Sequence, residues 1–116
     1  MKRAQPERQL QAAVAEYLKY ALPADAWFTS IPGGEGRATR TPGYVPGAPD
    51  MLIVHRGHAL FIELKSPKGA IPASQALCHM RLIDAGCGRV CVARSLNDVV
   101  AFLGPRGVPL RAKVAA

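Results

Sequence analysis

Two acidic residues and a lysine stand in an apolar part of the sequence, where charged side chains need a physical reason. Asp50 and Glu63 are the only acids between residues 47 and 65, and each is flanked by aliphatic or aromatic residues. Burying an unpaired carboxylate costs free energy, so acids kept in such surroundings are usually paired, or they bind something. What they could bind depends on whether they meet in the folded chain.

A hairpin turn at Arg56-Gly57 brings the two acids together. A two-residue loop is the commonest hairpin connection, and glycine accepts the positive φ that such turns need. Pairing outward from this turn places Asp50 directly opposite Glu63, with Cβ atoms about 5 Å apart on one face. Lys65, two residues beyond Glu63, is predicted to lie on that same face.

Two carboxylates so close repel each other unless a proton or a cation intervenes. Mg²⁺ or Mn²⁺ takes oxygen ligands of this kind, and Lys65 could then neutralise a phosphate or orient an attacking water. The alternative is a plain ion pair between Lys65 and one of the acids at a strand end. The opposed acids, the Gly-Ala-Pro approach to Asp50 and the basic chain favour the metal site.

Two helices could add further side chains. In the helix expected over residues 6–21, Glu7 points with Val14 and Leu18, so it faces inward. It is either a third carboxylate of the site or only a favourable acid in a first helical turn, and its geometry does not separate these. Gln75 opens the helix expected over 72–85 and could bond a water or phosphate oxygen, although a polar residue there needs no role.

The pattern of apolar residues predicts an α/β domain with a mixed sheet of about four strands flanked by helices, in the order α-β-β-β-α-β-α. Leu77, Met80 and Ile83 form an apolar stripe on one side of the second long helix. The 116 residues are expected to form a single domain, with a core over about 6–103 and a tail over 104–116 that is irregular or frayed. The remaining elements expected are strands over 26–31 and 89–93 and a helix from Ser95 to about Leu103.

Composition suggests the kind of partner. The net charge of +7 and the pI near 9.8 suggest a polyanion, although charge alone also serves solubility. The glycine- and proline-rich loop from Pro32 to Pro49 carries Arg37 and Arg40, and Lys68 lies in the turn after Lys65. These three basic residues are the candidate contacts with such a polyanion.

Other classes of function are disfavoured. No apolar run approaches the ~20 residues of a membrane span, and no phosphate-cradling or nucleophile motif points to an organic cofactor or covalent catalysis. Cys78, Cys87 and Cys91 lack zinc-site spacing and are expected to be small buried side chains. His55 and His58 are expected at a solvated hairpin tip. We expect a cytoplasmic protein.

The residues singled out above resemble the PD-(D/E)xK nuclease superfamily, and within it the VRR-NUC (virus-type replication-repair nuclease) family. The resemblance is carried by Gly47-Ala48-Pro49-Asp50, Glu63-Leu64-Lys65, Gly69 and Gln75, with Glu7 at the place of an early helical glutamate. Pro72-Ala73 departs from the family's frequent Ser-Pro, so a hydroxyl helix cap is missing.

The resemblance implies a restriction-endonuclease-like core and Mg²⁺- or Mn²⁺-dependent cleavage of DNA. It implies Asp50, Glu63 and the Leu64 carbonyl as metal ligands, with Glu7 and Gln75 completing the site and Lys65 at the attacking water. For a chain made of this domain alone it implies a homodimer acting on branched DNA, such as four-way (Holliday) junctions, in replication, repair or recombination, in a bacterial or phage setting.

A second hypothesis is a catalytically silent nucleic-acid-binding module on the same fold. The complete set of two acids and a lysine argues against it, because binding alone does not require them. A small basic regulator is a third reading, but the sequence shows no helix-turn-helix pattern.

Overall fold

The computed structural model describes residues 5–32, 41–86 and 90–113. They form α1 (Gln5–Ala21), β1 (Ala26–Ser30), β2 (Met51–His55), β3 (His58–Leu64), α2 (Ala73–Asp84), β4 (Val90–Ala93), α3 (Leu96–Leu103) and the 3₁₀ turn η2 (Gly104–Arg106). The predicted α/β class and the order of elements are confirmed, with helix and strand ends shifted by a residue or two. No helix in the described ranges is long and apolar enough to cross a bilayer.

One mixed sheet lies at the centre, with strand order β1-β2-β3-β4. The first three strands are antiparallel, and β4 runs parallel to β3 after the crossover through α2. The register of β2 and β3 begins at His55 opposite His58 and runs to Met51 opposite Ile62. The predicted two-residue turn is therefore confirmed, with Arg56 at φ 47° and Gly57 at φ 82°.

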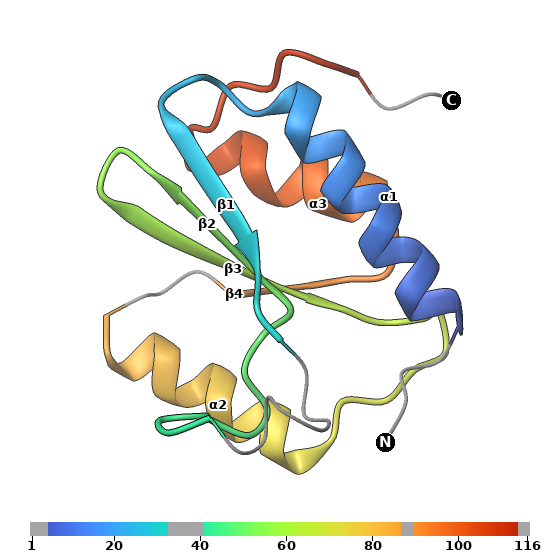
Figure 1. The fold of residues 1–116 in the computed structure, drawn as a ribbon, viewed down its shortest axis with the longest axis vertical. Helices are drawn as coiled ribbons and strands as arrows, with labels where there is room; N and C mark the ends of the chain where they lie inside the picture. The colour runs from blue at the N-terminus through green and yellow to red at the C-terminus, as the bar shows by residue number, and fades with distance from the viewer. Residues whose placement is uncertain (1–4, 33–40, 87–89, 114–116) are drawn as a thin grey trace.

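The main core lies on one face of the sheet. In Figure 1, α1 and α3 cover this face together, and α2 lies on the opposite side of the sheet. Side chains alternate between the two faces of the sheet, so every second side chain of a strand points toward α1 and α3. Ile53 and Ile62 are among them and have no exposed surface. Val14 and Leu18 of α1 and Val99 of α3 fill the space over them.

The apolar stripe of α2 does not face the sheet. Leu77, Met80 and Ile83 are each more than half exposed, and Cys78 is the buried apolar residue of this helix. The inward side of α2 instead carries Gln75 and polar neighbours that meet strand β3, as described below. Hydrophobic periodicity located the helix correctly, but it did not reveal which side of the helix is buried.

The C-terminal tail is irregular over residues 107–113, which agrees with the first of the two alternatives, and these residues are packed rather than frayed. Val108 is 2% exposed and belongs to the core, and Leu110 packs against it. The Arg111 N–H donates to the Ala21 carbonyl at 2.7 Å, and the Tyr17 hydroxyl donates to the Ala112 carbonyl at 2.7 Å. The tail thus covers the C-terminal end of α1, and the core extends beyond residue 103.

His55 is a second correction. It is only 4% exposed, because its side chain alternates onto the α1 face of the sheet, whereas His58 across the turn is exposed as expected. Its Nε2 lies 3.2 Å from Asp25 Oδ1, but in a direction that does not make a hydrogen bond. The contact is therefore an ion pair only when His55 is protonated. Arg56 donates to the other Asp25 oxygen at 3.0 Å and, as the largest cause, lowers the Asp25 pKa.

The packed tail yields a stability prediction. Val108→Ala removes two methyl groups from a closed part of the core, so the free energy of unfolding should fall by about 2 kcal/mol. Val45→Ala, at a half-exposed position, should change it by less than about 0.5 kcal/mol. Urea unfolding of both variants measures the difference. Equal losses in the two variants would mean that the tail contributes no core packing.

Candidate active site

Asp50 is fixed in place by hydrogen bonds on both sides of β2. Its backbone carbonyl accepts from the Ile31 N–H at 2.7 Å, which extends the pairing with β1 by one residue. Its side-chain Oδ2 accepts from the Leu64 N–H at 2.7 Å, where β3 ends. The carboxylate therefore takes the place of a backbone acceptor, and the hairpin register carries Asp50 to the position opposite Glu63.

Gly47 sets the path of the chain into Asp50. Its φ is +83°, a region that other L residues rarely adopt, and a Cβ built on it would lie 2.4 Å from the Ser74 carbonyl oxygen and 2.9 Å from the Gln75 nitrogen. The loop backbone thus packs directly on the first turn of α2. This contact fixes the helix that carries Gln75 relative to the strand that begins after Asp50.

Glu63 lies on the α2 side of β3 and is 2% exposed. Gln75 Nε2 donates to its Oε2 at 3.3 Å, and His79 Nε2 lies 3.4 Å from its Oε1. Gln75 therefore reaches Glu63, and its part in a metal site stays a prediction. The contact of His79 was not expected from the sequence, although its place one helical turn after Gln75 was a usable signal.

The charge state of His79 follows from these surroundings. Burial lowers the pKa of His79, the nearby Lys65 charge lowers it further, and the Asp50 carboxylate opposes both effects. The neutral imidazole is therefore favoured at neutral pH. His79 therefore lies within electrostatic range of Asp50 and Lys65. It is also in contact with Glu63.

Lys65 and Glu7 meet at the end of β3. Lys65 is 7% exposed, and its Nζ lies 3.9 Å from Glu7 Oε1, which is also largely buried. Its backbone N–H donates to the Ala93 carbonyl at 3.0 Å, so β4 holds the lysine in register. The expectation that Glu7 points inward is confirmed, since α1 brings it to the lysine. That Glu7 also binds a metal stays a prediction.

Arg94 holds the turn that follows Lys65. Its Nη1 donates to the Ser66 and Gly69 carbonyls, each at 2.7 Å, and its backbone N–H donates to Asp98 Oδ2 at 2.8 Å. This arginine was not singled out from the sequence. It could have been expected there, because the parallel pairing of β3 and β4 ends both strands at the same edge of the sheet.

The donor set suits a hard divalent cation in part. No group of three or more His, Cys, Asp or Glu side chains within the described ranges has the spacing of a metal site. However, Asp50 and Glu63 supply two carboxylates, and Gln75 Oε1 is buried without a hydrogen-bond partner. Mg²⁺ commonly uses one or two carboxylates together with waters and substrate oxygens, so the residues fit such an ion.

The predicted DNA contacts are only partly visible. Arg37 and Arg40 lie outside the described residues. Lys68 is exposed in the turn after Lys65, where the Gly69 N–H bonds to the Ser66 carbonyl at 3.0 Å. Lys68 is therefore accessible from solvent on the edge that carries the site. Its role in binding DNA stays a prediction.

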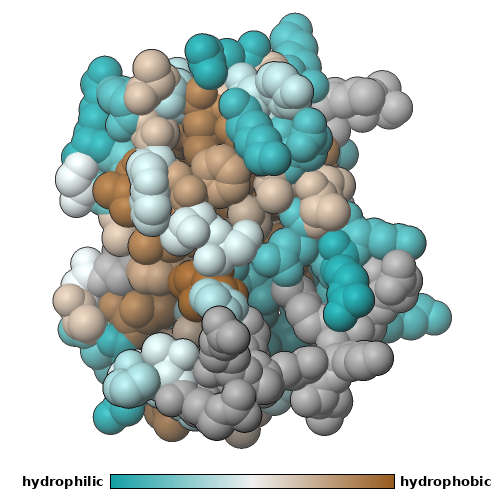
Figure 2. Space-filling model, in the orientation of Figure 1, coloured by the Kyte–Doolittle hydropathy of each residue, from teal (hydrophilic) through white to brown (hydrophobic). Residues whose placement is uncertain are grey.

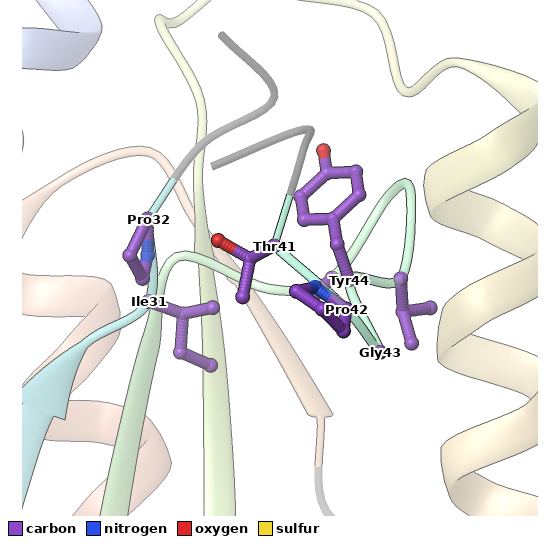
Figure 3. Close-up of a pocket in the computed structure, with 8 residues that line it drawn as sticks. Ile31, Pro32, Thr41, Pro42, Gly43 and Tyr44 are labelled. Atoms are coloured by element: carbon purple, nitrogen blue, oxygen red, sulfur yellow. The ribbon is translucent and has the colours of Figure 1, made fainter. Parts of the chain in front are cut away.

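A cavity of about 300 Å³ opens beside the approach to Asp50 (Figure 3). Figure 3 shows the ring of Tyr44 standing beside Thr41 and Pro42, with Ile31 and Pro32 on the other side. The lining is almost wholly apolar. The bond between the Ile31 N–H and the Asp50 carbonyl links the wall of this cavity directly to the acid.

The contact of Gly47 with α2 can be tested by a matched pair of substitutions. Gly47→Ala and Gly43→Ala both force alanine into φ near +84°, but only the first meets backbone atoms, because Gly43 has no atom within 4 Å. Gly47→Ala should therefore lower the free energy of unfolding by about 1–3 kcal/mol more than Gly43→Ala. Chemical denaturation provides the measurement, and equal effects would rule out the close approach.

Comparison with solved structures gives an informative likeness. No protein-family model matches the sequence, and no curated protein matches it. A solved structure described as a VRR_NUC domain aligns with 87% of this chain and 97% of its own length, at a TM-score of 0.62 and 24% sequence identity. At that identity the likeness establishes the architecture and leaves the activity open. The chain has the fold of a VRR_NUC domain.

Proposed function

We propose that this protein is a divalent-metal-dependent endonuclease that hydrolyses phosphodiester bonds in DNA. One observation carries the proposal: the paired residues of the β2–β3 hairpin run to Met51 opposite Ile62, so the next residues, Asp50 and the buried Glu63, lie at the same end of the hairpin, and Lys65 follows there. A nearly fully buried carboxylate beside a second acid is costly in a purely structural role. The fold of a VRR_NUC domain, a name that describes a nuclease, supports the proposal.

Each residue has a distinct part in the proposed reaction. Asp50, Glu63 and the Leu64 carbonyl would hold the Mg²⁺ or Mn²⁺, and the bound ion would supply the positive charge that polarises a phosphate and makes water more acidic. Lys65 balances charge on the phosphate or orients the attacking water. Its backbone is held by the Ala93 carbonyl and its ammonium group by Glu7. Gln75 holds Glu63 and leaves an unpartnered oxygen in the site.

The substrate is proposed to be structured or branched DNA, in replication, repair or recombination. A net charge of +7 on 116 residues favours contact with phosphates, and such contacts read shape and charge more than sequence. The glycine-rich loop with Arg37 and Arg40, together with Lys68, is the proposed binding surface.

Asp50→Asn and Lys65→Met test the chemistry with little change in shape. The asparagine oxygen can still accept the Leu64 N–H, so the hairpin end is retained while the charge is lost. Cleavage of labelled junction, flap, single-stranded and duplex DNA with Mg²⁺ or Mn²⁺ should fall by roughly a hundredfold or more in each variant. Binding to the same DNA, measured with Ca²⁺ or EDTA present, should persist.

His58→Asn, an exposed change at the far end of the hairpin, is the control and should cleave normally. A wild-type protein that binds these DNAs but cuts none of them with either metal would contradict the proposal. It would instead support the silent binding module.

A homodimer is part of the proposal, and an exposed apolar surface supports it. Glu63 faces α2, and Ala59, four residues earlier on β3, lies on the same side because side chains alternate along a strand. Paired residues share a face, and Ala59 pairs with Val54, which pairs with Trp27. Trp27 and Val54 therefore lie on the α2 side of the sheet. We call the exposed apolar residues on this side the outer face: Trp27, Val54, Leu77, Met80 and Ile83. Figure 2 shows apolar surface between the hairpin and α2.

The chemistry of the outer face fits a second copy better than it fits DNA. Its residues carry no charge, and the neighbouring Arg81 and Asp84 of α2 offset each other, although the chain as a whole is strongly basic. Phosphate binding needs positive charge, which this surface lacks. It exposes on the order of a few hundred Å² of apolar surface, a substantial part of the roughly 800 Å² that each partner buries in a standard interface.

Met80→Glu tests the dimer by a change on the outer face. Light scattering on a size-exclusion column should give the wild type twice the 12.4 kDa chain mass, and Met80→Glu the mass of one chain, because two buried glutamates would face each other. Tyr20→Glu, a similarly exposed position on α1, should stay dimeric. A monomeric wild type at tens of micromolar would contradict the dimer, and a dimeric Met80→Glu would exclude this surface.

A further inference from the structure

The carboxylate of Glu63 is contacted at both oxygens by one helix. Gln75 Nε2 lies 3.3 Å from Oε2, and His79 Nε2 lies 3.4 Å from Oε1. The Glu63 side chain is 2% exposed and the His79 side chain 12% exposed, while Gln75 is intermediate in exposure with its Oε1 buried. Two nitrogen atoms thus approach one carboxylate from α2, each directed to a different oxygen.

The spacing of these residues explains how one helix makes both contacts. Positions 75 and 79 are four apart, so they lie on the same side of α2, one turn after the other. Leu77, Met80 and Ile83 point outward. The side of α2 that meets the sheet therefore carries Gln75, His79 and Cys78. The contact of α2 with β3 is therefore directed at Glu63 itself.

We propose that His79 is a positioning residue for Glu63. Its Nε2–H donates to Glu63 Oε1 while Gln75 holds Oε2, so that the plane of the carboxylate is fixed toward the cation shared with Asp50. The inference rests on the proposed metal site. Both contacts are longer than typical hydrogen bonds. Contacts of catalytic side chains often tighten in the working complex. Partners of ligating carboxylates typically change metal affinity 10–100-fold.

Two amide substitutions that differ only in reach provide the test. In His79→Gln, the terminal NH₂ reaches about as far as the imidazole Nε2, whereas in His79→Asn it stops one carbon short. Binding of Mn²⁺ alone, without DNA, is measured by calorimetry and by the loss of the free-ion electron paramagnetic resonance signal. His79→Gln should bind within about threefold of the wild type, and His79→Asn roughly 10–100-fold more weakly.

His58→Asn, the same change at an exposed histidine, is the matched control and should bind as the wild type does. Equal affinity in the wild type and both His79 variants would overturn the inference. So would an equal loss in both variants, because reach to Glu63 would then not matter.

A metal-free measurement separates this inference from the proposed function. Long-range ¹⁵N–¹H correlation spectra at pH 8, where an ordinary histidine is neutral, report which ring nitrogen of His79 carries the proton. The proton should be on Nε2, and Glu63→Gln should shift the His79 ring nitrogens. A proton on Nδ1, or no response to Glu63→Gln, would overturn the inference. A wild type that binds no Mn²⁺ would reject the proposed metal chemistry, while this spectrum still decides the contact.

Discussion

The feature on which the rest of the structure depends is the open end of the β2–β3 hairpin, where two carboxylates meet. The two-residue turn at Arg56-Gly57 sets a register that carries Asp50 opposite Glu63. The Asp50 side chain then replaces a backbone acceptor for the Leu64 N–H at 2.7 Å. The pairing that stabilises the sheet therefore also brings the two acids to the same end of the hairpin.

The surrounding elements can be understood by how they support this pair. From one side of the sheet, α1 brings Glu7 to Lys65, and β4 holds the lysine backbone. From the other side, α2 brings Gln75 and His79 to Glu63, and the close approach of Gly47 fixes the start of that helix. Helix α2 therefore links the proposed dimer surface, on its outward side, to the proposed cation site, on its inward side.

The sequence predicted those parts of the structure that depend on local chemistry. The turn residues determined the hairpin register, and the register alone paired Asp50 with Glu63. Helical periodicity turned Glu7 inward, and the crossover helix returned β4 parallel to β3, as expected. The resemblance to VRR-NUC nucleases, based on a few short motifs, agrees with the fold that the structural comparison established.

The missed features depend on contacts between distant parts of the chain. An apolar stripe on α2 gave the helix but not its orientation, because the sheet face beneath it carries Glu63, which requires polar partners. The tail after Leu103 has no periodic pattern, yet Val108 is buried and its N–H donates to the Leu103 carbonyl at 3.3 Å. His79 and Arg94 were overlooked because their partners are 16 and 25–28 residues away.

The central claim is that Asp50 and Glu63 form one cation site, and a single diffraction experiment tests it most directly. Crystals soaked in Mn²⁺ and measured where manganese scatters anomalously should show a peak between the two carboxylates, within about 2.0–2.6 Å of an oxygen of each. Asp50→Asn crystals treated in the same way should lose that peak. A well-ordered site with no anomalous density, or density only at other residues, would contradict the account.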